Sequence, residues 1–172
     1  MTHKIMLCFV RSDSDILESS WLNRIAASLA KTDDENAPFI HAELLFCPQG
    51  SHTGQDSVSG LACSIVYSGS VHLEKKRFSR KEWFFRSMEC SKSQYETMLT
   101  FCQERQGDSF NHLGYFMYWA PLSPSPMSYT YLGMSPRWYC SEIVIAAMKE
   151  GDMLASDIPN SMHPHDLYKL VQ

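Results

Sequence analysis

Alternation of apolar and polar residues predicts strands in several segments of this chain. The apolar run Ile5 to Val10 is bounded by charged residues and has the length of a strand. In Phe39 to Phe46 the apolar residues at even positions share one face, while His41 and Glu43 share the other. Three more strands, separated by short turns, are expected as an antiparallel meander: Leu61 to Tyr67, Val71 to Phe78 and Glu82 to Cys90. These segments predict a central antiparallel sheet of about five strands.

Apolar residues three and four positions apart predict helices elsewhere. Leu17 to Lys31 carries such a stripe. Ser91 to Gly107 is the clearest helix, because Ser91 can cap its first turn and Gly107 can end it. Another helix is expected from Cys140 to a stop at Gly151, which places Cys140 at the helix N-terminus. A short closing helical turn is expected at Asp166 to Val171.

The remaining segments are predicted as loops. Thr32 to Pro38 is charged, and Pro48 to Gly60 is rich in Gly, Ser and Gln. Prolines in Pro121 to Tyr131 exclude a regular helix or a central strand there. The preceding segment, Phe110 to Ala120, is densely aromatic and includes Trp119. Its rings are expected either in the core or in the wall of an apolar substrate cleft, where Trp119 would contact substrate.

Composition narrows the class of protein. A chain of 172 residues fits a single domain, here 1–172, and 44% hydrophobic residues suffice for one core. A net charge of -4 gives no general attraction to nucleic acid or to anionic lipid. No segment approaches the roughly 20 apolar residues that cross a bilayer, so stable membrane insertion is not expected. The pattern and composition together predict an α+β domain.

The cysteines point to a reducing environment. The chain has six of them, and their scattered positions lack the paired spacing of a disulfide framework. Free thiols are therefore expected, and with them a cytoplasmic location. Most of the six lie within or beside apolar runs, where cysteine usually behaves as a small buried residue. Cys140 differs because it begins a helix.

Cys140 is the candidate nucleophile. The unpaired amides and positive dipole of a helix N-terminus favour a thiolate, and the same amides can stabilise an oxyanion. His41 is the candidate general base, because its strand face is free to meet the Cys140 helix. Glu43 could orient the imidazole or bind substrate, and Ser64 on the following strand competes for the orienting role. Tyr139 is a candidate for the cleft wall.

Two motifs carry a resemblance to a known family. They are His41-Ala42-Glu43-Leu44 on a strand and Trp138-Tyr139-Cys140-Ser141-Glu142-Ile143-Val144 at a helix start. Over about residues 5 to 150 the chain resembles the permuted NlpC-type papain-like superfamily, and within it the YiiX-like branch. Members place the histidine upstream of the nucleophilic cysteine, the reverse of papain. They include amidases, peptidases and, in the lecithin:retinol acyltransferase branch, acyl-transfer enzymes.

The resemblance implies a permuted papain-like fold with the nucleophile helix packed on the sheet. It implies a cysteine hydrolase, of amidase, peptidase or thioesterase type, that acts on a peptide, amide or acyl ester through an acyl-enzyme without a cofactor. In the family the third residue is commonly a His, Asn, Gln or acid on the strand after the histidine. That strand here offers Ser64, and His72 lies one strand further on.

Other interpretations stay open at this point. A cysteine before an apolar helix is often structural, so a catalytically silent scaffold that serves in binding or assembly is an alternative. An acyltransferase that passes the acyl group to an amine or a lipid is another. His112 is an alternative base in a predicted turn. The sequence does not fix an oligomeric state.

Metal and phosphate sites are weaker candidates. The pairs Cys47 with His52 and His163 with His165 lack the companions that a zinc site needs, so no metal is expected. A basic run could contact phosphate or an acidic partner, although such a run is more often the solvent-facing side of a hairpin. The run comprises Lys75, Lys76, Arg77, Arg80 and Lys81.

Overall fold

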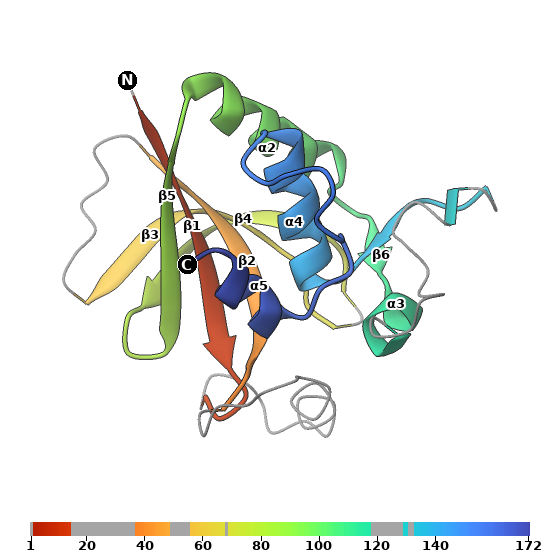
Figure 1. The fold of residues 1–172 in the computed structure, drawn as a ribbon, viewed down its shortest axis with the longest axis horizontal. Helices are drawn as coiled ribbons and strands as arrows, with labels where there is room; N and C mark the ends of the chain where they lie inside the picture. The colour runs from red at the N-terminus through yellow and green to blue at the C-terminus, as the bar shows by residue number, and fades with distance from the viewer. Residues whose placement is uncertain (1, 15–36, 49–55, 68, 118–128, 131–132) are drawn as a thin grey trace.

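Five strands form an antiparallel sheet in the computed structural model, which describes residues 2–14, 37–48, 56–67, 69–117, 129–130 and 133–172. The order of the strands in the sheet is β4-β3-β2-β1-β5. The helices α2, α4 and α5 lie on one side of this sheet (Figure 1). The strands are β1 (His3–Arg11), β2 (Phe39–Cys47), β3 (Ser57–Ser64), β4 (His72–Ser79) and β5 (Trp83–Cys90). The α+β class and the five-stranded antiparallel sheet are therefore confirmed.

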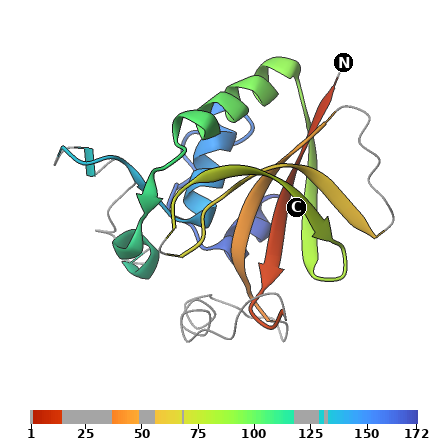
Figure 2. The same ribbon diagram turned by 180° about the vertical axis from the view of Figure 1, so that it is seen from behind.

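Alternation along the strands builds two separate apolar clusters. On the helix side, Ile5 and Leu7 of β1 pack in one cluster with residues of α2, α4 and α5. On the other side, Phe78 of β4 lies 4.8 Å from the Trp83 ring and 6.4 Å from the Phe85 ring, both on β5. β4 and β5 are the two edges of the sheet, so their contact requires a strongly curved sheet. Figure 2 shows β4, in yellow-green, arching across the sheet.

The predicted meander is wrong in its last strand. β5 follows β4 by a short turn but pairs with β1, in the register Cys8↔Phe85 and Val10↔Trp83. This pairing gives the apolar strand β1 a partner on both sides, which buries it completely from Ile5 to Val10. Local turn signals could not indicate it, because pairing across the sheet is decided by which strands need burial.

The boundary between the predicted loop and β3 is also wrong. Pro48 to Gly60 was expected as a loop, but β3 begins at Ser57 and buries Val58. A glycine is required within this strand, because a Cβ at Gly60 would lie 2.4 Å from the Phe46 carbonyl oxygen. Gly60 therefore marks close approach of two strands rather than a loop. β3 ends at Ser64, before the expected Tyr67.

The main helices agree with the sequence pattern, with shifted ends. α2 (Lys92–Glu104) is capped by Ser91, whose Oγ accepts a hydrogen bond from the Gln94 N–H at 3.2 Å. It stops short of Gly107, which has a φ of +90° in the turn beyond. α4 (Cys140–Glu150) begins and ends as predicted, with Gly151 as its C-cap. α5 (Pro164–Leu170) begins two residues before the expected Asp166, because His163 caps it.

Three short elements were not predicted. α3 (His112–Met117) lies within the aromatic segment, so His112 is in a helix and the predicted turn is wrong. β6 (Ser109–Phe110) and β7 (Arg137–Trp138) form a parallel pair. This pair leads directly into α4 and fixes where its first residue lies.

Several predictions fall outside the described residues. They are the helix from Leu17 to Lys31, nearly all of the linker before Phe39, the residue Trp119, and most of the loop from Pro121 to Tyr131. Among the helices that the structure does describe, none combines the length and apolar character needed to cross a bilayer. All six cysteines are free and buried.

Candidate active site

The chain enters α4 through a fixed backbone path. The Asn111 N–H donates to the Trp138 carbonyl at 2.8 Å, next to the β6–β7 pair. Tyr139 then takes an extended conformation as the N-cap residue, and its N–H donates to Glu142 Oε2 at 3.1 Å. Because both the carbonyl and the N–H of the peptide group between Trp138 and Tyr139 are hydrogen-bonded, Cys140 has little freedom at the helix start. Its exposed fraction is 3%.

A buried carboxylate holds the start of α4 to two other segments. Glu142 is fully buried, and its Oε2 also accepts a hydrogen bond from Asn111 Nδ2 at 3.1 Å. Its Oε1 accepts from Ser161 Oγ at 3.0 Å. Burial raises the pKa of Glu142 to about 8, against the opposing effect of these hydrogen bonds. From the sequence alone, no role was predicted for Glu142 beyond its place in the motif.

Removing the charge of Glu142 is expected to flatten the pH dependence of stability. A folded-state pKa of about 8, above the ordinary 4.5, means stability that is fully present below pH 4.5 and is lost as the pH rises through 8. At 1.36 kcal/mol per unit, the loss is about 5 kcal/mol. In Glu142→Gln, the side-chain amide can still accept from Asn111 and donate to Ser161, so this loss disappears.

The measurement is the free energy of unfolding of both proteins across this pH range, by urea denaturation. The difference between the two curves isolates Glu142 from other titrating groups. Glu150→Gln, at the exposed end of the same helix, is the matched control and is expected to leave the curve unchanged. Parallel curves for Glu142→Gln and the wild type would contradict the prediction.

His41 and Cys140 meet, as the candidate mechanism requires. The pairing of β2 with β3 covers Leu44 to Phe46 of β2, so it does not reach His41. At this end of β2 the Cys140 thiol lies close enough to the His41 ring to raise the pKa of the imidazole. The His41 side chain is 15% exposed, and its ring lies 6.1 Å from that of Trp83.

Glu43 contacts the other side of the imidazole. His41 Nε2 lies 3.1 Å from Glu43 Oε1, which leaves Nδ1 as the ring nitrogen free to exchange a proton with the thiol. Burial lowers the pKa of His41, but the hydrogen bonds and charges of Cys140 and Glu43 outweigh burial and raise it to about 10. The imidazolium form is therefore strongly favoured beside the Cys140 sulfur and the Glu43 carboxylate.

The competing candidate, Ser64, lacks this geometry. Ser64 is fully buried, and within the described part of the chain its Oγ has no hydrogen-bond partner.

Glu43 has an exposed fraction of 2% and accepts hydrogen bonds from Lys76 Nζ at 3.0 Å on Oε1 and 3.1 Å on Oε2. Burial raises the pKa of Glu43, but the hydrogen bonds and charges of His41 and Lys76 bring it below its ordinary value.

Lys76 was not among the residues predicted for the site, because the whole basic run was expected to face solvent. Lys75 and Arg77 are exposed, as expected, but the Lys76 side chain is only 29% exposed. The alternation of side chains along a strand could have indicated this, because Lys76 is two residues from Phe78 and therefore shares its buried face. Lys76 therefore points to the same side of the sheet as Glu43.

The other candidates take different positions. Tyr139 is 1% exposed and packs against the Tyr115 ring at 5.7 Å, so it supports the site from the core. The His112 ring packs against Tyr67 and Phe110. The Nδ1 of His163 accepts a hydrogen bond from the N–H of His165 at 3.2 Å. Among the described residues, no group of three or more His, Cys, Asp or Glu side chains is placed to hold a metal ion.

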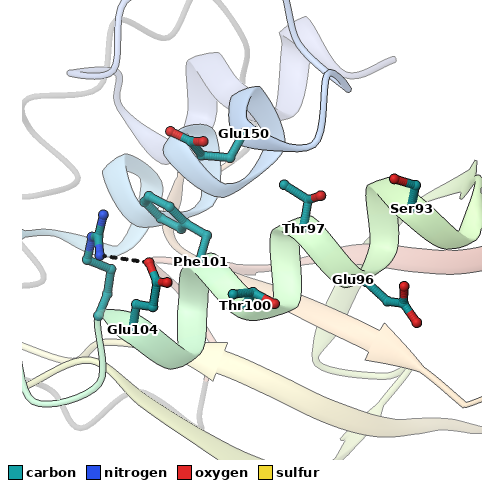
Figure 3. Close-up of a pocket in the computed structure, with 8 residues that line it drawn as sticks. Ser93, Glu96, Thr97, Thr100, Phe101, Glu104 and Glu150 are labelled. Carbon is teal, nitrogen blue, oxygen red and sulfur yellow. Dashed lines mark hydrogen bonds and ion pairs between the residues drawn. The ribbon is translucent and has the colours of Figure 1, made fainter.

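A surface hollow of about 380 Å³ lies between α2 and the end of α4 (Figure 3). None of its lining residues belongs to the cluster of Cys140, His41 and Glu43. The lining is Ser93, Glu96, Thr97, Thr100, Phe101, Glu104, Arg105 and Glu150. Glu104 is paired there with Arg105 at 3.4 Å, an exposed contact that contributes little to stability.

The cluster of thiol, imidazole and carboxylate comes from two elements, β2 and the N-terminus of α4. It brings together a thiol, an imidazole and a carboxylate, the kinds of group that nucleophilic acyl transfer uses. Comparison of the chain with models of protein families, with curated proteins and with solved structures found no match.

Proposed function

We propose that this protein is a papain-like cysteine hydrolase of the permuted type, acting on an amide, peptide or acyl-ester bond. The observation that carries the proposal is the contact of the His41 ring with both Cys140 and Glu43. A thiol at a helix N-terminus, an imidazole beside it and a carboxylate behind the imidazole are the parts of a nucleophilic triad.

The electrostatics of His41 support a thiolate and imidazolium pair as the resting form. With a pKa of about 10, the ring retains its proton at neutral pH when Cys140 is ionised. Glu43 stabilises the imidazolium through the Nε2 contact of 3.1 Å. In the proposed mechanism Cys140 therefore attacks as the thiolate.

In the proposed reaction the Cys140 sulfur attacks the substrate carbonyl carbon, and the carbonyl electrons move to the oxygen. The backbone N–H of Cys140, at the start of α4, is a donor for that oxyanion. His41 gives its proton to the leaving nitrogen or oxygen as the bond to the acyl carbon breaks. A water molecule, deprotonated by His41, then attacks the thioester carbonyl, so that the carboxylic acid product leaves and the thiolate and imidazolium are restored.

Selective alkylation tests the proposal against a silent scaffold, which the 3% exposure of Cys140 favours. We expect iodoacetamide at neutral pH to modify Cys140 at least about tenfold faster than any other cysteine. Burial raises the pKa of Cys8, Cys47 and Cys90, so those thiols stay protonated. Peptide mass spectrometry after timed labelling gives each rate.

Hydrolysis of a panel of amide and ester substrates, with Cys140→Ser as the control, then distinguishes an enzyme from a reactive thiol. Uniform slow labelling of all six cysteines, together with the absence of turnover, would support the scaffold instead. The proposed chemistry also needs a reduced thiol, which fits a reducing compartment such as the cytoplasm.

A further inference from the structure

Lys76 meets both oxygens of the Glu43 carboxylate with one ammonium group. The two Nζ contacts, 3.0 and 3.1 Å, fix the plane of the Glu43 carboxylate as well as its position. The oxygen that faces His41 is thereby held in one direction. A carboxylate with a single partner could rotate away from the imidazole.

The sheet is built to let the lysine reach Glu43. β3 lies between β2 and β4, so the side chain must cross one strand to reach the carboxylate. Lys76 pairs with Gly60 on β3, and the next residue on the same face of β3 is the small Ala62. These two positions leave the space through which the lysine stem crosses.

The contact of Lys76 with Glu43 is important because Glu43 is buried. Glu43 has an exposed fraction of 2%, and burying a carboxylate without a counter-ion is costly. Around it stand Cys8 of β1, His41 of its own strand and Lys76 of β4, with Glu74 beyond the lysine at 3.2 Å. Cys140 of α4 faces the far side of the imidazole. Of these groups, Lys76 alone carries a permanent positive charge.

We propose that Lys76 is a positioning residue of the candidate site, which keeps Glu43 ionised and directed at His41. This inference rests on the proposed function for its catalytic meaning. Lys76 does not touch the reacting atoms; it acts through Glu43 and then His41. The candidate triad is thereby extended to a fourth residue that comes from the edge of the sheet.

The test compares Lys76→Met, Lys76→Arg and Lys75→Met across the acid pH range. Lys76→Met removes the charge but keeps the stem, and Lys76→Arg keeps a charge that can contact both oxygens. Lys75→Met is the matched control, because Lys75 is the exposed neighbour on the same strand. The rate of Cys140 alkylation is measured for each protein from about pH 4 to pH 9.

In Lys76→Met, we expect the fall in the alkylation rate at acid pH to occur about one pH unit higher than in the wild type. At a fixed acid pH the rate is then about tenfold lower. The rate near pH 8 stays within about threefold of wild type, because Glu43 is ionised there in both proteins. Lys76→Arg restores the wild-type profile, and Lys75→Met never departs from it. An equal loss at every pH, or a wild-type profile for Lys76→Met, would overturn the proposal.

A readout without turnover separates this inference from the proposed function. The ¹³C titration of the Glu43 carboxyl is expected to shift to higher pH in Lys76→Met and to stay unchanged in Lys75→Met. If wild-type Cys140 proves unreactive, the proposed function fails, while this titration still decides whether Lys76 keeps Glu43 ionised. An unchanged Glu43 titration in Lys76→Met rejects the role of Lys76 even when Cys140 is reactive.

Discussion

Replacing His41 with alanine should slow the alkylation of Cys140 by about 100-fold near pH 6 and by less than about threefold near pH 9. In the proposed mechanism the imidazolium stabilises the thiolate, which the raised pKa of His41, about 10, supports. Without such a partner, well under about 1% of an ordinary thiol is ionised at pH 6. At pH 9 most ordinary thiols are ionised, so the advantage disappears.

Labelling with iodoacetamide for set times, followed by mass spectrometry of the Cys140 peptide, measures the alkylation rates near pH 6 and near pH 9. His72→Ala is the control, because His72 is also a strand histidine with a carboxylate partner, Glu74 at 3.4 Å, but lies at the surface. Circular dichroism checks that both variants are folded. A pH-independent effect of His41→Ala, or an equal effect of His72→Ala, would refute the assignment of His41.

Glu43→Gln should reduce the rate of Cys140 alkylation at neutral pH by about 100-fold, with a larger effect on turnover. A neutral amide removes the negative charge that stabilises the imidazolium at the 3.1 Å contact between Glu43 Oε1 and His41 Nε2. Without that charge the imidazole holds its proton less tightly, so it stabilises a Cys140 thiolate less.

The same substitution should lower the free energy of unfolding by about 3 kcal/mol, because it removes the buried counter-ion of a partly buried ammonium and leaves it only the exposed Glu74. Urea denaturation measures this change. Glu74→Gln removes the exposed carboxylate from the same lysine and is expected to change the free energy by less than about 1 kcal/mol. Ser64→Ala is expected to keep the reactivity of Cys140. Loss of reactivity in Ser64→Ala but not in Glu43→Gln would transfer the orienting role to Ser64.

Local sequence patterns were sufficient where a structure depends on neighbours along the chain. The alternation in β2 placed His41 and Glu43 on one face, which is enough to predict their contact. The helical period and Gly151 placed Cys140 at the start of α4. Ser91 predicted the cap of α2. In each case the relevant atoms are within four residues of each other, so backbone geometry alone brings them together.

Patterns failed where the outcome depends on distant segments. The pairing of β5 with β1, and not with β4, is decided by the need to cover an entirely apolar strand on both sides. The helix α3 was not predicted, because the aromatic residues of its segment give no clear helical period. The short parallel pair β6 and β7 has no pattern of its own, since each strand contains two residues.

The sequence by itself determined which residues have the chemistry for catalysis: a thiol at a helix start, and an imidazole two residues from a carboxylate on a strand. Only the tertiary structure decided which of them meet. The end of the β2–β3 ladder before His41 lets α4 bring Cys140 to the ring, and the curvature of the sheet lets Lys76 reach Glu43 from two strands away. Those contacts join residues far apart in sequence, and long-range burial, rather than local periodicity, fixes them.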